Sequence, residues 1–185
     1  MKKLIMAGYG GQGMFACGQI LSHTAMMQGY NVTCFPSYGA EVRGGAVACQ
    51  VVISEKPVGS PVVQKADIVV VCSQPAYDKF YNNMAAGTVV IYNTALVKLK
   101  NKRDDVRYAG FDFSALSTEL GFQRAFNMIV LGVITEAIKL SKVDRNAVCQ
   151  SLADKFKTQS ADVIAANVKG VDMGISEAKK VFSKQ

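Results

Sequence analysis

The sequence predicts one α/β domain over residues 1–185, with a helical C-terminal part. Short apolar runs alternate with helical segments through the first two thirds of the chain, and a helical period dominates the last third. The continuous apolar run 68–72 is typical of a strand that is buried on both faces. A length of 185 residues suits a single core, and 50% hydrophobic with 19% charged residues excludes a disordered chain.

The chain opens with the pattern of a βαβ unit. Residues 4–7 form a short apolar strand, a glycine-rich loop follows, and residues 14–28 have helical character up to Gly29 as a C-terminal cap. Residues 31–35 form a second strand, which Pro36 is expected to stop. This order predicts a parallel pair of strands joined by a right-handed crossover.

The remaining elements follow from apolar runs, caps and helical periods. Asp112 and Asp144 each stand where a helix N-cap is expected. Gly170 and Gly174 interrupt the last helical pattern, which predicts either one helix or two. The expected ranges are strands over 46–53, 68–72, 88–92 and 106–111, and helices over 75–84, 113–120, 124–140, 145–157 and 161–182.

Composition narrows the classes of protein and site. The five cysteines are widely spaced and no CxxC pair occurs, so zinc or iron–sulfur ligation within this chain is not expected. We expect a cytoplasmic protein without membrane contact. The thiols are expected to be free, the start lacks a signal-peptide pattern, and no apolar run of about 20 residues occurs. The net charge of +7 is moderate and no nucleic-acid-binding motif accompanies it, so we expect no nucleic-acid partner.

The glycine loop is the first candidate site. Gly8, Gly10 and Gly13 match GxGxxG between an expected strand and an expected helix, which gives the chain a Rossmann-like opening. Glycines let a backbone approach a ligand closely, and the N–H groups of a helix N-terminus suit an anion. Residues 32–37 lack the acid that would bind a ribose, and Gly-Lys-Ser/Thr is missing. A ligand-free structural turn, a phosphate or adenylate contact, and NAD binding all stay open.

A second feature is a stretch without charge. Residues 4–40 contain no Asp, Glu, Lys or Arg, although the expected helix 14–28 should expose one face. That face carries Gln19, Ser22, Met26 and the only histidine, His23, which we expect to be packed rather than catalytic. Depletion of charge is typical of interface cores, so either another chain or this chain's own C-terminal helices are expected to cover the face.

The loop over residues 38–45 is the third feature. Its charges are Glu41 and Arg43, set among three glycines. They either form a local ion pair, or Arg43 meets a carboxylate or phosphate in a cleft. Because the loop follows the second strand, we expect it at the same edge of the sheet as the glycine loop.

These residues together resemble a known family. The runs 8–13 (GYGGQG) and 38–45 (YGAEVRGG), the pairs Ser60-Pro61 and Ala66-Asp67, and Asn127 ahead of Leu131-Gly132 resemble the gamma subunit of 2-oxoacid:ferredoxin oxidoreductases. The resemblance covers about residues 3–181 and the two glycine motifs carry most of it. It implies a three-layer α/β/α sandwich with a mixed, mostly parallel sheet.

The resemblance implies an activity for a complex. Such complexes convert a 2-oxoacid, coenzyme A and oxidised ferredoxin to acyl-CoA, carbon dioxide and reduced ferredoxin, with thiamine diphosphate, magnesium and iron–sulfur clusters. This chain has no cluster-spaced cysteines and no Gly-Asp-Gly run, so alpha and beta subunits, with or without a delta subunit, are expected to hold those groups. The isolated chain is expected to be inactive and to hold no cofactor firmly. A separate chain without a fused cluster domain favours the 2-oxoglutarate type over the pyruvate type.

The resemblance also implies roles for the residues of the two motifs, and no residue of this chain is expected to be catalytic or to bind a metal. The residues expected to bind a cofactor, with coenzyme A as the ligand, are Gly8, Gly10, Gly11, Gln12 and Gly13. The residues expected at the junction with the catalytic subunits are Tyr38, Gly39, Glu41, Arg43, Gly44 and Gly45. The alternatives are a free-standing Rossmann-type nucleotide-binding protein and a non-catalytic interaction protein.

Overall fold

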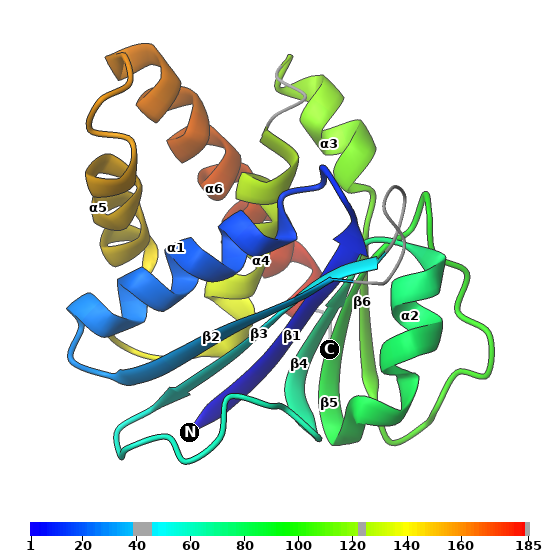
Figure 1. Ribbon diagram of the computed structural model, residues 1–185. Coiled ribbons are helices and arrows are strands. Elements are labelled where there is room, and N and C mark those ends of the chain that lie inside the picture. Colours follow the sequence, from blue (N-terminus) through cyan, green and yellow to red (C-terminus); the bar gives the residue numbers. More distant parts are fainter. Residues whose placement is uncertain (39–45, 122–124, 184–185) are drawn as a thin grey trace.

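A six-stranded sheet organises the chain in the computed structural model, which describes residues 1–38, 46–121 and 125–183 (Figure 1). The described strands are β1 (Lys2–Tyr9), β2 (Asn31–Tyr38), β3 (Ala46–Ser54), β4 (Ala66–Val71), β5 (Met84–Asn93) and β6 (Arg107–Phe111). The described helices are α1 (Met14–Met27), α2 (Gln74–Phe80), the 3-10 turn η1 (Tyr81–Asn83), α3 (Phe113–Glu119), α4 (Phe126–Ile138), α5 (Arg145–Lys155) and α6 (Ala161–Phe182).

The strand order is β2-β3-β1-β4-β5-β6. Strands β1, β4, β5 and β6 are parallel to their neighbours in this series, whereas β3 runs antiparallel to both β1 and β2. The sheet is therefore mixed and mostly parallel, as predicted. The expected parallel pairing of the first two strands was wrong. β1 and β2 point the same way, but β3 lies between them and pairs with both, from Lys2↔Ile53 and from Asn31↔Ser54 onward.

Pro36 does not stop the second strand. β2 continues to Tyr38, with Pro36 opposite Cys49 of β3. In the part of the chain that the structure describes, β2 is an edge strand and pairs with β3 alone. A proline has no N–H to donate, and an edge strand tolerates this because one of its sides has no partner strand.

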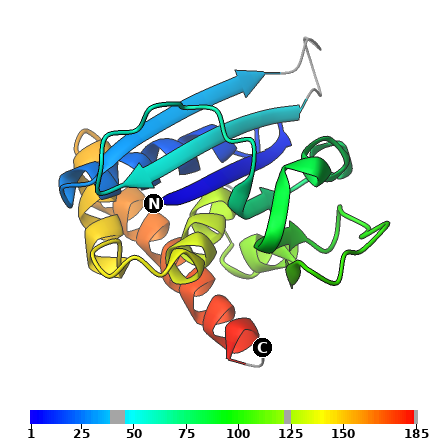
Figure 2. The ribbon, with the colours of Figure 1, turned by 90° about the horizontal axis from the view of Figure 1, so that it is seen from below.

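Two apolar cores lie on opposite faces of the sheet. Leu4 and Met6 of β1 pack under α1 and α4, while Ile5 and Ala7 pack with the residues of α2. This alternation is the period of two that a strand imposes on its side chains. With α2 on one face and α1, α4, α5 and α6 on the other, the predicted three-layer arrangement is confirmed (Figure 1). Figure 2 shows α6, in orange to red, extending away from the strands.

The C-terminal pattern forms one helix, α6, rather than two. Its interrupting glycines are packing positions. A β-carbon on Gly174 would overlap the carbonyl oxygen of Ile129 in α4, and one on Gly132 of α4 would overlap the carbonyl oxygen of Val171. The low helix propensity of glycine, about 1 kcal/mol relative to alanine, is offset here by close contact between two helices.

The predicted caps are confirmed. Asp112 and Asp144 accept hydrogen bonds from the backbone N–H groups of Ala115 and Ala147, each at 2.9 Å. The second predicted helix is shorter than expected, because η1 follows Phe80 and β5 already begins at Met84. Among the described residues, no helix combines the length and apolar character that crossing a membrane would require.

Candidate functional site

The candidate site lies where β1 and β4 end side by side. After β1 the chain turns to one half of the sheet, which holds β2 and β3, and after β4 it turns to the other half. Ligands of open α/β sheets bind at such a switch point, outside the carboxyl ends of the parallel strands. The loop 8–13 follows β1 at this point, and Ser73, the N-cap of α2, follows β4.

Three positions of this loop accept only glycine, two because of their backbone angles and one because of a neighbouring side chain. Gly11 and Gly13 have φ values of 93° and 74°, in the left-handed region that other residues avoid. A β-carbon on Gly13 would also lie 2.6–2.9 Å from the side chain of Asn127 in α4. Gly8 has no room for a β-carbon, because the side chain of Gln12 occupies that space. The fold therefore requires these three glycines whether or not a ligand binds.

Gln12 ties the loop to the neighbouring strand. Its Oε1 accepts a hydrogen bond from the backbone N–H of Tyr9 at 2.7 Å, and its Nε2 donates to the carbonyl oxygen of Cys72 at 3.1 Å. The side chain thus bridges the ends of β1 and β4 across the switch point. Both polar ends of Gln12 are used within the protein, which supports the structural-turn alternative for this residue.

Gly10 is the part of the loop that stays open. It is exposed, and a β-carbon on it would have only Val47 Cγ2 within 4 Å, at an ordinary contact distance of 3.9 Å. Beside it, α1 begins at Gly13 without a side-chain cap, and its first internal bond runs from the N–H of Cys17 to Gly13 O. The preceding N–H groups of the first turn have no acceptor within the helix, so the loop and the helix end can receive an anion.

Tyr38 is the residue of the second motif that the structure describes. Tyr38 ends β2 opposite Val47, whose Cγ2 would lie 3.9 Å from a β-carbon on Gly10, and Tyr38 is 65% exposed. The predicted junction residues Gly39, Glu41, Arg43, Gly44 and Gly45 lie outside the described residues.

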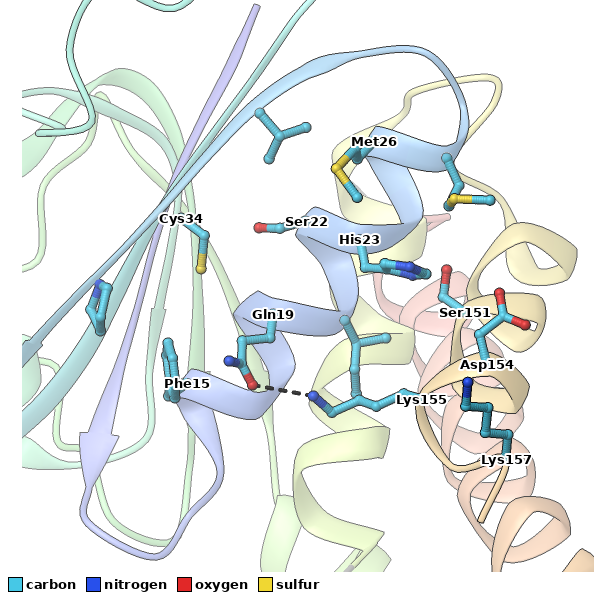
Figure 3. A pocket seen from close by; sticks show the side chains of 14 residues that line it. Phe15, Gln19, Ser22, His23, Met26, Cys34, Ser151, Asp154, Lys155 and Lys157 are labelled. Atoms are coloured by element: carbon cyan, nitrogen blue, oxygen red, sulfur yellow. Dashed lines mark hydrogen bonds between the residues drawn. The ribbon is translucent and has the colours of Figure 1, made fainter. Parts of the chain in front are cut away.

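The charge-free face of α1 is partly covered by the chain itself. α5 packs beside α1, and Lys155 Nζ donates a hydrogen bond to Gln19 Oε1 at 3.2 Å. Between α1, β2 and α5 a cavity of about 810 Å³ remains, with Ser22, His23 and Met26 in its wall (Figure 3). Coverage by the chain's own C-terminal helices therefore accounts for part of this face. Sequence analysis missed the cavity because its three walls come from distant segments.

The buried thiols of Cys17 and Cys72 do not suit a metal cluster. In the described part of the chain, no three His, Cys, Asp or Glu side chains converge as metal ligands. Cys17 and Cys72 are buried, and burial raises the pKa of Cys17 to about 12 and also raises that of Cys72. Such thiols stay protonated, whereas cluster ligands are thiolates.

Comparison with known proteins decides the family. The sequence model of the family described as pyruvate ferredoxin/flavodoxin oxidoreductase matches residues 3–177. The chain belongs to this family. Membership confirms the resemblance predicted from the two glycine motifs, and the match covers both the loop 8–13 and the segment 38–45.

Curated relatives in this oxidoreductase family fall into two length classes. The ketoisovalerate oxidoreductase subunit VorA of Methanothermobacter marburgensis is 33% identical over 175 residues, which cover 95% of this chain and 36% of the relative. This chain thus spans about a third of that relative's length. The 2-oxoglutarate synthase subunit KorC of Archaeoglobus fulgidus is 30% identical over 177 residues, which cover 95% of this chain and 87% of the relative.

Solved structures of similar proteins share the fold. The gamma subunit of a keto/oxoacid ferredoxin oxidoreductase from Geobacter sulfurreducens has a TM-score of 0.79 at 23% identity, with 97% of this chain and 99% of that chain covered. The 2-oxoglutarate:ferredoxin oxidoreductase of Magnetococcus marinus has a TM-score of 0.86 at 24% identity, with 97% of this chain but 32% of that chain covered. At these identities the likeness establishes the α/β architecture.

Proposed function

We propose that this chain is the gamma subunit of a multisubunit 2-oxoacid:ferredoxin oxidoreductase of the 2-oxoglutarate type. The family match over residues 3–177 carries the proposal, and the KorC relative supports it because it is similar to this chain along most of its own length. The complex would convert a 2-oxoacid and coenzyme A to acyl-CoA and carbon dioxide, and would reduce ferredoxin. Ketoisovalerate is the second candidate substrate, because the VorA relative is 33% identical.

In this proposal the chain forms one wall of the active site or of the coenzyme A site, and other subunits hold the reactive groups. Alpha and beta subunits, with or without a delta subunit, would hold thiamine diphosphate, magnesium and the iron–sulfur clusters, in the cytoplasm. The buried thiols of Cys17 and Cys72 support the division of labour, because burial raises the pKa of both and disfavours the thiolate that a cluster needs. Without its partners the chain would be inactive.

We assign the contact with coenzyme A to the loop 8–13. Gly10 is exposed at the carboxyl edge, and the unpaired N–H groups of the first turn of α1 lie next to it. A phosphate of coenzyme A would meet backbone N–H groups there, at the positive end of a helix dipole. Tyr38 is exposed on the same edge, which suits a junction with the catalytic subunits formed by the residues Tyr38, Gly39, Glu41, Arg43, Gly44 and Gly45.

The assembly is tested by purifying a tagged chain from its native cells without oxygen. Reduction of methyl viologen by the co-purified material is measured with 2-oxoglutarate, pyruvate, indolepyruvate and branched oxoacids, with and without coenzyme A. Activity that depends on coenzyme A, together with larger iron-bearing chains, is the expected result, and the preferred oxoacid names the substrate. A lone chain that binds NAD(P) would overturn the proposal in favour of the free-standing nucleotide-binding protein.

The loop is tested with Gly10→Ala in the purified complex. The added methyl group has space in the free protein, so the fold should stay intact while close approach of a ligand is blocked. We expect the KM for coenzyme A to rise several-fold, with the KM for the oxoacid unchanged. Gly59→Ala, at a position with nothing within 4 Å, is the matched control. Equal changes in both KM values would reduce the loop to a structural turn.

A further inference from the structure

Two cysteine thiols touch beneath α1. The Sγ atoms of Cys34 in β2 and Cys49 in β3 are 3.4 Å apart and form a hydrogen bond. Cys34 pairs with Val51 and Cys49 pairs with Pro36, so the two cysteines are diagonal neighbours on the face of the sheet that packs against α1. Fifteen positions separate them in the sequence, so only the pairing of β2 with β3 brings them together.

The two thiols differ in access. Cys49 is fully buried, whereas Cys34 is half-buried and lines the cavity between α1, β2 and α5. Figure 3 shows the sulfur of Cys34 on the side of β2 that faces Ser22 and Gln19 of α1. Of the other cysteines, Cys17 and Cys72 are buried, and Cys149 is half-buried on α5. Cys34 therefore combines an open approach with a hydrogen-bonding neighbour.

We propose that Cys34 is the nucleophile of a covalent thiol-modification site, and that the cavity of about 810 Å³ admits the small anionic disulfide that modifies it. The wall of the cavity suits a polar guest. Two cationic side chains, Lys155 and Lys157, and one carboxylate, Asp154, line the cavity, so its charged groups are positive on balance. Nδ1 of His23 is buried there without a hydrogen-bond partner among the described residues. This proposal is independent of the oxidoreductase complex.

The chemistry is thiol–disulfide exchange. The Cys34 thiolate attacks one sulfur of the disulfide, a new S–S bond forms to Cys34, and the original S–S bond breaks. The departing half leaves as a thiolate with the electron pair of the broken bond and takes a proton from water. Overall, one protein thiol and one disulfide give one mixed disulfide and one small thiol.

The surroundings favour the thiolate. The hydrogen bond from the Cys49 S–H lowers the pKa of Cys34 below its ordinary value, against the opposing effect of partial burial. The same contact, with burial, raises the pKa of Cys49, so Cys49 keeps its proton. The other titratable groups around the pair are His23 and Cys17 on α1, and Asp154, Lys155 and Lys157 on the α5 side.

The test uses the full reduced chain. It is incubated with glutathione disulfide, which is anionic, or with cystamine, which is cationic, and adducts are located by peptide mass spectrometry. We expect the glutathione adduct at Cys34 to form about ten-fold faster than at Cys149, and faster than the cystamine adduct. Equal labelling of the two cysteines, or preferred labelling of Cys149, would overturn the proposal, and faster reaction with cystamine would overturn the anionic class.

Two variants of Cys49 separate the role of the hydrogen bond from that of access. Cys49→Ala removes the donor, so the midpoint of the pH dependence of Cys34 labelling should move to higher pH. Cys49→Ser keeps a donor and should retain the low midpoint. Cys149→Ala is the control that should change neither midpoint nor rate at Cys34. A midpoint that is the same in all three folded variants would refute the assigned part of Cys49.

Discussion

Gly132 of α4 and Gly174 of α6 bring two helix backbones into direct contact: a β-carbon on either glycine would lie 3.0 Å from the Cα of the other. The neighbouring atoms are backbone carbonyls of Ile129 and Val171, which cannot move aside as a flexible side chain can. The packing of α6 against the rest of the domain therefore depends on both glycines.

Gly174→Ala should lower the free energy of unfolding by about 1–3 kcal/mol, because overpacking between backbones outweighs the helix propensity gained. Urea unfolding followed by circular dichroism measures the change. Gly59→Ala serves as the control, since nothing lies within 4 Å of a β-carbon there. An increase in stability for Gly174→Ala would show that the helices can separate without loss.

Gln12→Leu should release the loop 8–13 from the end of β4. The variant loses the acceptor for the Tyr9 N–H and the donor to Cys72 O, which should cost roughly 1–2 kcal/mol. Amide exchange of Tyr9 should become faster, and unfolding by urea should occur earlier. In Gln12→Glu the acceptor for Tyr9 remains, so its amide should stay protected; loss of protection there would contradict the assigned bond.

The protein should lose stability as the pH rises from about 8 to 10. Burial raises the pKa of Cys17 and Cys72 in the folded state, so the unfolded chain releases these thiol protons first. The free energy of unfolding then falls, by up to roughly 1.4 kcal/mol per pH unit and thiol. Urea titrations at several pH values measure the slope. Cys72→Ala should flatten it, and an unchanged slope would show that Cys72 does not contribute.

The ion pair between α5 and α6 should contribute little to the free energy of unfolding. Arg145 meets Asp172 through both Nε and Nη2, but the two side chains are 48% and 42% exposed, so solvent screens them. Arg145→Ala should lower the free energy of unfolding by less than about 1 kcal/mol. Added salt should reduce the difference in stability between the variant and the parent protein. A double-mutant cycle with Asp172→Ala isolates the pair. A coupling of several kcal/mol would mean that the pair is shielded from solvent.

Local signals in the sequence predicted most helices and strands. They could not predict which strands lie next to each other in the sheet. Asp112 and Asp144 were identified as caps because a cap and its helix are adjacent in the chain. The insertion of β3 between β1 and β2 depends on pairing across more than thirty positions, as in Tyr9↔Ala46. A strand tolerates proline only at the edge of a sheet. The sequence does not reveal that β2 lies at the edge, so Pro36 was expected to end the strand.

The candidate site shows the same division. The sequence identified the loop 8–13 and the segment 38–45, and the strand pairing brings the described ends of both to one edge. The bond of Gln12 to Cys72 could not be predicted, because it joins residues sixty positions apart. The contact between Cys34 and Cys49 was missed for a related reason, since the two cysteines carry no motif and meet only after β2 pairs with β3.

The place of β1 in the sheet constrains the order in which the domain can assemble. β1 precedes both its neighbours, β3 and β4, in the chain. Its apolar residues Leu4 to Ala7 are fully buried in the fold, and they can be buried only after those strands have formed. Such long-range closure slows folding and leaves an unpaired apolar strand exposed in the meantime. Growing chains that end between β1 and β3 therefore expose an apolar segment that a chaperone can bind.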